Sequence, residues 1–142
     1  MTAKTITVAI FDDEQLKREA IARAISGRKS GNFVFDIPGW AVGASLEQGK
    51  LIIKKDTLKN IKIFLVDGKM DGDNNAGYEL AQKIRSERPD ALIISISINT
   101  DERGWYDAHL NTTIKSQRYP IFLESELRKL KSRAIEKKDL IL

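Results

Sequence analysis

Two short apolar runs, each ending at aspartate, constrain the fold of this chain more than any other feature. The runs cover residues 6–11 and 61–66, and they are followed by Asp12-Asp13 and by Asp67. Short runs rich in β-branched residues and bounded by turn formers are typical of strands buried on both faces of a parallel sheet. Because ligands bind beyond the carboxyl ends of such strands, we expect the chemistry of the chain to lie at these aspartates.

Strand-like and helix-like segments alternate along the chain. Short runs of β-branched and aromatic residues predict strands, and apolar residues at helical spacing predict helices. Residues 33–60 have the weakest pattern, because Pro38-Gly39 and Gly49 interrupt it. In chain order, the expected elements are a strand at 5–11, a helix at 14–26, a strand at 33–35, a helix within 46–58, a strand at 61–66, a helix at 78–88, a strand at 91–97, a short helix at 101–110, a strand at 111–114 and a helix at 123–134.

This alternation predicts an α/β fold in which helices cover both faces of a parallel sheet. We expect a flavodoxin-like, doubly wound sheet of five parallel strands in the order 2-1-3-4-5, forming a single domain over residues 1–142. In this order the first and third strands are neighbours. Their carboxyl ends would therefore bring Asp12, Asp13 and Asp67 to one crevice.

The three carboxylates predict a metal site that supports phosphoryl chemistry. Closely spaced carboxylates repel one another, so at neutral pH they need a cation or a proton. Ligation by oxygen atoms alone, with room for water, suits Mg²⁺. Ser97 at the end of the fourth strand and Lys115 at the end of the fifth add a hydroxyl and an ammonium, which together would seat a phosphoryl group. One carboxylate can then act as the nucleophile and form an acyl phosphate.

Five short motifs follow one another in a distinctive order. They are Val8-Ala9-Ile10-Phe11-Asp12-Asp13-Glu14, Phe64-Leu65-Val66-Asp67-Gly68-Lys69-Met70, Gly77-Tyr78-Glu79-Leu80, residues 93–97 and Ile114-Lys115. This ordered set resembles the receiver domain of two-component response regulators, and in particular the chemotaxis-type single-domain regulators. The resemblance spans nearly the whole chain and implies a stand-alone receiver without an output domain.

The resemblance implies a role for each residue of the acidic group. Asp67 matches the phospho-acceptor of the family, and Asp12 and Asp13 match its Mg²⁺-binding acids. The backbone carbonyl of Lys69 would supply a further metal ligand. The implied cofactor is therefore Mg²⁺, held by three carboxylates and one carbonyl.

Further residues match positions that respond to the phosphoryl group. Ser97 matches the hydroxyl residue that senses it, and Lys115 matches the lysine that pairs with a phosphate oxygen. Lys69 and Asn99 lie two residues beyond Asp67 and Ser97, at positions that tune the dephosphorylation rate in this family.

The chain also departs from the family pattern. The loop at 70–77 is longer and more acidic than usual, and Ser116 follows Lys115 where the family has proline. The segment between Ser97 and Lys115 is short, so we expect a reduced fourth helix. Residues that carry the chemistry are thus present, whereas residues that carry the output switch are altered.

Composition bounds the location and the partners. The chain has no cysteine, which excludes disulfides and thiolate metal sites. No apolar run is long enough for a membrane span, and the first residues lead directly into a strand, so we expect a cytoplasmic protein without a membrane partner. The net charge is +4, but the basic residues of the last helix are interleaved with glutamates. Such a mixed face is usually solvated and does not favour nucleic acid as a partner.

Three functions compete for this pattern. The first is a signalling switch that accepts a phosphoryl group on Asp67 from a histidine kinase or phosphotransfer protein and later hydrolyses it, rather than turning over a separate substrate. The second is a pseudo-receiver, a protein-interaction module without phosphorylation, which the long loop and Ser116 motivate. The third, a haloacid-dehalogenase-like phosphatase, needs a carboxylate where Lys69 stands. The sequence does not identify the cognate kinase or the downstream protein target. It is compatible with a homodimer.

Two other features do not predict sites. The stretch Asp71-Gly72-Asp73-Asn74-Asn75 is similar to the start of a calcium loop, but Ala76 and Gln82 occupy the positions that require glycine and glutamate. His109 is the only histidine of the chain. Without partners for a metal site, it is expected to be a surface or partly packed residue.

Overall fold

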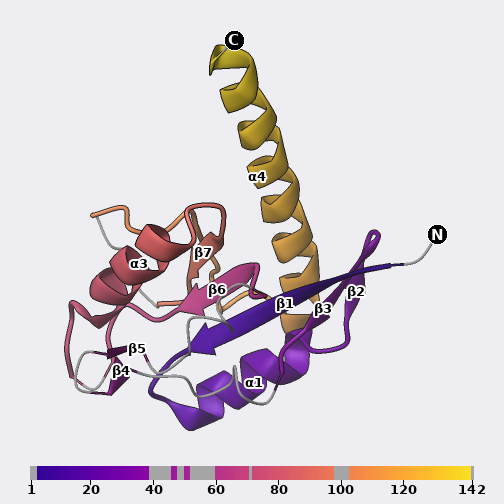
Figure 1. Cartoon of the computed structure of the whole chain (residues 1–142). Coiled ribbons are helices and arrows are strands. Elements are labelled where there is room, and N and C mark those ends of the chain that lie inside the picture. Colours follow the sequence, from indigo (N-terminus) through magenta and orange to yellow (C-terminus); the bar gives the residue numbers. More distant parts are fainter. Residues whose placement is uncertain are drawn as a thin grey trace.

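The computed structural model of the chain describes residues 3–38, 46–47, 50–51, 60–70, 72–97 and 103–141. Within them, six strands form one sheet (Figure 1). In spatial order these are β2 (Lys29–Ser30), β3 (Phe33–Asp36), β1 (Lys4–Phe11), β6 (Ile63–Val66), β7 (Leu92–Ser95) and β8 (Ala108–His109). All neighbours pair in parallel except β2, which is antiparallel to β3. The parallel strands thus follow the predicted 2-1-3-4-5 order, and β2 is an additional edge strand.

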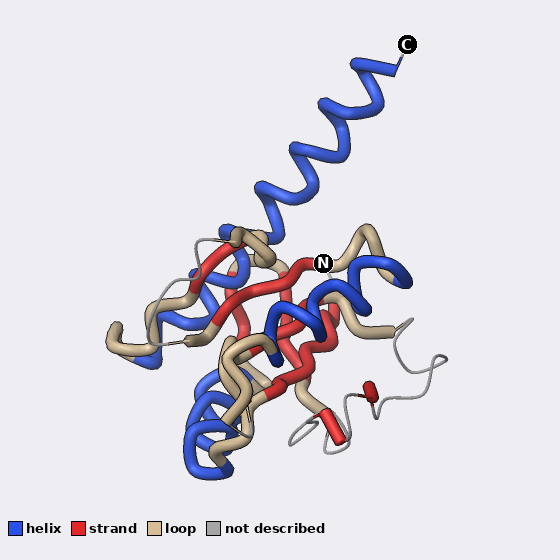
Figure 2. Tube along the Cα trace, turned by 90° about the vertical axis from the view of Figure 1, so that its left-hand side faces the viewer, coloured by secondary structure: helices blue, strands red, loops and turns tan. Residues whose placement is uncertain are grey.

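Helices pack on both faces of this sheet. They are α1 (Gln15–Ile25), α3 (Ala76–Glu87) and α4 (Tyr119–Ile141). Successive side chains of a strand point to opposite faces, and β1 follows this rule. Val8 and Ile10 join the core cluster that contains buried residues of α1 and α4. Ala9 and Phe11 join the cluster that contains buried residues of α3. The sheet is therefore the middle layer of three, as the views in Figures 1 and 2 show.

The predicted structure between the fourth strand and the last helix is wrong. Among the described residues between β7 and β8, no helix forms, and the fifth parallel strand is β8 at Ala108–His109 instead of residues 111–114. Gly104 has a positive φ of 65°, which a helix does not accommodate. The N–H groups of Asp107 and Leu110 donate to carbonyls of β7 at 2.8 Å each, so the segment is held extended. Neither a short helix over 101–110 nor a strand at 111–114 is therefore seen in residues 103–114.

The predicted helix within residues 46–58 is also wrong in its described part. Leu46–Glu47 (β4) and Lys50–Leu51 (β5) form an antiparallel pair. In the sequence, Gly49 lies between them, and glycine favours a turn over a helix. The rest of the predicted helix, at 52–58, lies outside the described residues.

The last helix extends well beyond the body of the protein. A short 3₁₀ helix, η2 (Ser116–Arg118), leads into α4. Leu123 and Leu127 of α4 are buried in the core, whereas its later turns project away from the sheet (Figures 1 and 2). Within the described part of the chain, no helix has the length and apolar character needed to cross a membrane.

Candidate functional site

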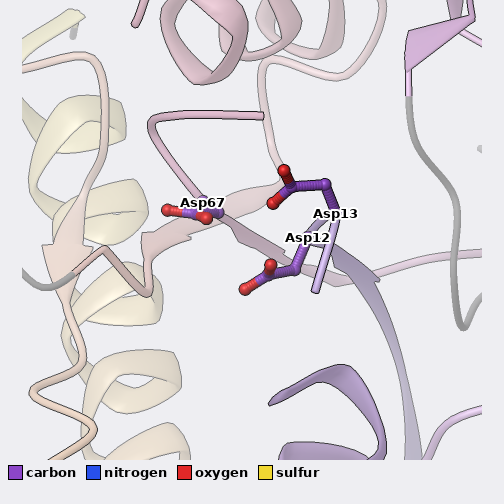
Figure 3. A group of neighbouring side chains, drawn as sticks. All are labelled: Asp12, Asp13 and Asp67. Atoms are coloured by element: carbon purple, nitrogen blue, oxygen red, sulfur yellow. The ribbon is translucent and has the colours of Figure 1, made fainter. Parts of the chain in front are cut away.

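Three aspartates meet where β1 and β6 end. Phe11 and Val66 are the last paired residues of these neighbouring strands, and Asp12 and Asp67 follow them directly. The Asp67 N–H donates to the Phe11 carbonyl at 2.9 Å, which extends the pairing to the first residue after β6. Carboxylate oxygens of Asp12, Asp13 and Asp67 all lie within 4.8 Å of one another (Figure 3). The structure therefore brings together the acidic group that the sequence predicted.

Asp12 is the most deeply placed of the three. Its residue is fully buried, and its Oδ1 accepts a hydrogen bond from the Glu14 N–H at 2.9 Å. Its Oδ2 forms an ion pair with the Lys17 ammonium, 3.0 Å away, although no described residue donates a hydrogen bond of good geometry to it. Burial raises the pKa of Asp12, and the Glu14 N–H and the Lys17 ammonium oppose this rise only in part. A buried carboxylate whose charge is only partly compensated is a position where a further cation lowers the free energy.

Asp67 is accessible but held in place. Its side chain is 14% exposed, so a reactant can reach it. The Ser97 hydroxyl donates to Asp67 Oδ1 at 3.1 Å and accepts from the Gly68 N–H at 2.5 Å. Ser97 follows β7, the strand beside β6. The predicted hydroxyl residue thus lies against the predicted acceptor.

Gly77, in the first turn of α3, packs against the backbone of Asp67 and Gly68. Its N–H donates to the Gly68 carbonyl at 3.0 Å. A Cβ on Gly77 would lie 2.6 Å from both the Asp67 carbonyl oxygen and the Gly68 Cα, which real Cβ atoms do not tolerate. Glycine at this position therefore lets α3 approach the backbone of the site. The sequence motif at Gly77-Tyr78 included this residue, but it did not predict the contact with the backbone of Asp67 and Gly68.

Lys17 is the residue of the site that the sequence analysis missed. It lies near the start of α1, and its ammonium is 3.0 Å from Asp12 Oδ2 and 3.9 Å from Asp67 Oδ2. Its side chain is 20% exposed. The available signal was its position, because a helix that begins just after the acids directs its first turn at them.

For the other predicted site residues the structure gives only exposure and position in the chain, and one of them lies outside the described part. Lys115 is exposed and directly precedes η2, six positions after β8 ends at His109. Among the described residues, no ion pair joins Lys115 to an aspartate of the site. The side chain of Lys69 is exposed, two residues after Asp67. Asn99 lies outside the described residues.

A cavity of about 930 Å³ opens at the opposite end of the sheet. Its lining includes Lys4, which begins β1, and Lys62, which precedes β6, but none of the three aspartates. The acidic group is thus separate from the large cavity. Because Mg²⁺ binds oxygen ligands and retains water, the clustered carboxylates fit such an ion without an enclosed pocket.

Comparison with known proteins finds similarity at the level of structure. No protein-family model matches the sequence, and no curated protein matches it. A structure of the response regulator TrrA from Thermotoga maritima, in complex with Mg²⁺ and BeF, superposes with a TM-score of 0.59 at 24% identity, covering 88% of this chain and 98% of that one. A CheY-like receiver domain protein from Methanospirillum hungatei gives a TM-score of 0.58 at 17% identity, covering 95% and 99%. One from Clostridium thermocellum gives 0.57 at 16% identity, covering 96% and 99%.

These neighbours are response-regulator receiver domains, and they cover most of the chain. At such low identity the similarity establishes the fold. The fold of this chain is therefore that of a receiver domain, and the carboxylate cluster at the ends of β1 and β6 is consistent with the acidic site of that fold.

Proposed function

We propose that the chain is a phosphorylatable signalling switch, with Asp67 as the residue that accepts the phosphoryl group. One observation carries this proposal: an accessible aspartate lies within 4.8 Å of two further carboxylates and accepts a hydrogen bond from Ser97. A nucleophile needs access, and a phosphoryl group needs both positive charge and hydrogen-bond donors around it. The receiver fold supports the same conclusion.

In this proposal the carboxylates of Asp12, Asp13 and Asp67, with the backbone carbonyl of Lys69, hold Mg²⁺. When bound, the ion supplies positive charge that offsets the carboxylates and the phosphoryl oxygens. Asp12 is buried and held at one oxygen by the Glu14 N–H, and its other oxygen would exchange its pairing with the Lys17 ammonium for the ion. Asp13 is exposed and completes the group from the solvent side.

The transfer step uses an oxygen of Asp67 as the nucleophile. It attacks the phosphorus of a phosphohistidine on a histidine kinase or phosphotransfer protein. A P–O bond forms while the P–N bond breaks, and the imidazole nitrogen keeps the electron pair and takes a proton from solvent. In the later hydrolysis, water attacks the phosphorus, the P–O bond to Asp67 breaks, and the products are inorganic phosphate and the free carboxylate.

Ser97 connects this chemistry to the surface of the protein. Its hydroxyl bridges Asp67 Oδ1 and the Gly68 N–H in the unmodified protein. A phosphoryl group on Asp67 offers new acceptor oxygens, so the hydroxyl would leave this arrangement to donate to them. A downstream protein target would read the resulting change around Ser97.

Phosphotransfer is tested with a small phosphodonor such as acetyl phosphate in the presence of Mg²⁺. The intact mass of the wild-type chain should increase by one phosphoryl group, and removal of Mg²⁺ with a chelator should abolish the increase. Asp67→Asn should show no increase. The matched control is Asp73→Asn, an exposed aspartate of the neighbouring loop, which should be phosphorylated like the wild type.

A second candidate is the pseudo-receiver that binds a protein without being phosphorylated. One observation favours it: the Lys17 ammonium already compensates charge on Asp12 and Asp67 without a metal. If this candidate holds, neither the wild type nor Asp67→Asn gains a phosphoryl group at any Mg²⁺ concentration. Such a result would contradict the switch.

A further inference from the structure

The proposed switch leaves one charge at the site without a partner. Transfer to Asp67 adds a dianionic group beside Asp12 and Asp13. A cation within reach of the new oxygens would stabilise it. Lys115, which the family resemblance assigned to this task, is exposed and directly precedes η2.

Lys17 is already in the required position. The two oxygens of Asp67 face different groups: Oδ1 accepts from the Ser97 hydroxyl at 3.1 Å, and Oδ2 lies 3.9 Å from the Lys17 ammonium. A phosphoryl group on this carboxylate would therefore form between a hydroxyl on one side and an ammonium on the other.

The start of α1 is fixed to the acidic strand end, which keeps Lys17 close. The guanidinium of Arg18 donates to the Asp12 carbonyl at 2.6 Å, and the Arg18 N–H donates to the Glu14 carbonyl at 3.0 Å. The Glu14 N–H in turn donates to Asp12 Oδ1. These bonds hold the backbone of the helix, while the long side chain of Lys17 retains rotatable bonds with which to follow a moving partner.

We infer that Lys17, on α1, is the cation that pairs with the phosphoryl group on Asp67, in place of Lys115 at the β8 edge. This inference rests on the proposed phosphotransfer function. In the unmodified protein the ammonium pairs with Asp12, 3.0 Å away. After transfer it pairs with a phosphoryl oxygen, because the added group brings more negative charge than the carboxylate it modifies.

Binding of beryllofluoride, which mimics an acyl phosphate on aspartate, measures this pairing without phosphoryl turnover. Trp105 is a suitable reporter, since its Cζ2 lies 3.6 Å from where a Cβ on Gly68 would sit. The experiment uses the full chain with Trp40→Phe, so that one tryptophan remains. Beryllofluoride is titrated in saturating Mg²⁺ against the Lys17→Met, Lys17→Arg and Lys115→Met variants.

We expect Lys17→Met to weaken beryllofluoride binding by about 10- to 100-fold, the usual effect of one hydrogen bond to a charged group. Lys17→Arg should recover part of the affinity because it keeps the charge. Lys115→Met should bind like the parent. Circular dichroism and melting temperature identify any variant that fails to fold, in which case Lys17→Gln replaces Lys17→Met.

Three outcomes would overturn the inference. Folded Lys17 variants that bind like the parent show that the ammonium does not face the phosphoryl group. Loss of binding in Lys115→Met, with Lys17→Met unaffected, returns the role to Lys115. If the parent chain does not bind beryllofluoride, the result contradicts the proposed function and therefore also the role of Lys17.

Discussion

The β1–β6 end of the sheet and its β8 edge are built in different ways. At the first, four backbone pairs align Val8–Phe11 with Ile63–Val66, and all eight residues are fully buried. The aspartates simply continue these strands. At the second, only Ala108–His109 pairs with β7, and side-chain contacts of Asp107 support it. Long backbone pairing thus positions the acids, whereas the segment that leads to Lys115 has only a short backbone pairing, supported by side chains.

The largest effect is expected from Mg²⁺, which should stabilise the β1–β6 end of the sheet more than the β8 edge. At a concentration 100 times its dissociation constant, an ion that binds only the folded state raises the free energy of unfolding by about 2.7 kcal/mol. Amide hydrogen exchange should slow most in β1 and β6, beside Asp12 and Asp67, and least in β8.

Asp12→Asn is the matched variant for the Mg²⁺ experiment. It should lose the stabilisation by Mg²⁺ and yet be more stable than the wild type without metal. The reason is that burial raises the pKa of Asp12, so its ionised form destabilises the fold at neutral pH. Equal Mg²⁺ stabilisation of both proteins, measured by denaturant unfolding, would contradict a metal site at this strand end.

The second effect is expected from a substitution that disturbs backbone packing beside the aspartates at the β1–β6 end of the sheet. Gly77→Ala places a Cβ 2.6 Å from the Asp67 carbonyl oxygen and the Gly68 Cα, so either α3 or the backbone at Asp67 and Gly68 must shift. We expect a loss of about 2 kcal/mol in stability, within the range for overpacked positions, and weaker Mg²⁺ binding. Ala76→Gly, which removes a Cβ from the same helix turn, should cost about 1 kcal/mol and leave Mg²⁺ affinity unchanged.

The third effect is expected from a substitution that removes side-chain contacts at the β8 edge and leaves Asp12, Asp13 and Asp67 unchanged. Asp107 Oδ2 accepts from the Arg85 guanidinium at 2.7 Å and from the Ile93 N–H at 2.8 Å. Asp107→Ala should cost about 1.5 kcal/mol and speed exchange of the Leu110 N–H, with Mg²⁺ binding unchanged. Asp90→Ala, which removes an exposed pair with Arg88, should stay within about 0.5 kcal/mol of the wild type. A parallel loss of Mg²⁺ affinity in Asp107→Ala would show that the two regions are coupled.

The smallest effect is a pH dependence at the same edge. Burial lowers the pKa of His109, and its Nδ1 has no hydrogen-bond partner among the described residues. His109 therefore takes up a proton more readily in the unfolded chain, where its pKa has the ordinary value of about 6.5, than in the folded chain. Stability should fall as the pH drops from about 7 toward 5, with a smaller slope in His109→Gln. Identical slopes in the two proteins would exclude this contribution.

The acid end was predictable because a single physical pattern determines it. Val8–Phe11 and Ile63–Val66 are buried on both faces, so their residue types alone mark them as interior strands. Strands that end on aspartate then place carboxylates at the edge where ligands bind. Ser97 was predictable for the same reason, since it follows the interior strand β7.

The β8 edge and Lys17 were not predictable by such a pattern. β8 has only two paired residues, and Asp107, a polar residue that sequence patterns assign to a turn or helix, is held by Arg85 of α3 across the fold. The true strand therefore lies earlier in the chain than the apolar pattern near Lys115 indicated. In the sequence, Lys17 has the same appearance as any lysine on a solvated helix face, and only its place beside Asp12 distinguishes it.

The most direct measurement is a crystal structure of the chain with Mn²⁺ and beryllofluoride, because the anomalous signal of Mn²⁺ marks its position. We predict one anomalous peak among the carboxylates of Asp12, Asp13 and Asp67, and beryllofluoride on Asp67 with the Lys17 ammonium beside it. Crystals that contain no such peak, with Asp67 unmodified and Lys17 still paired to Asp12, would contradict this prediction.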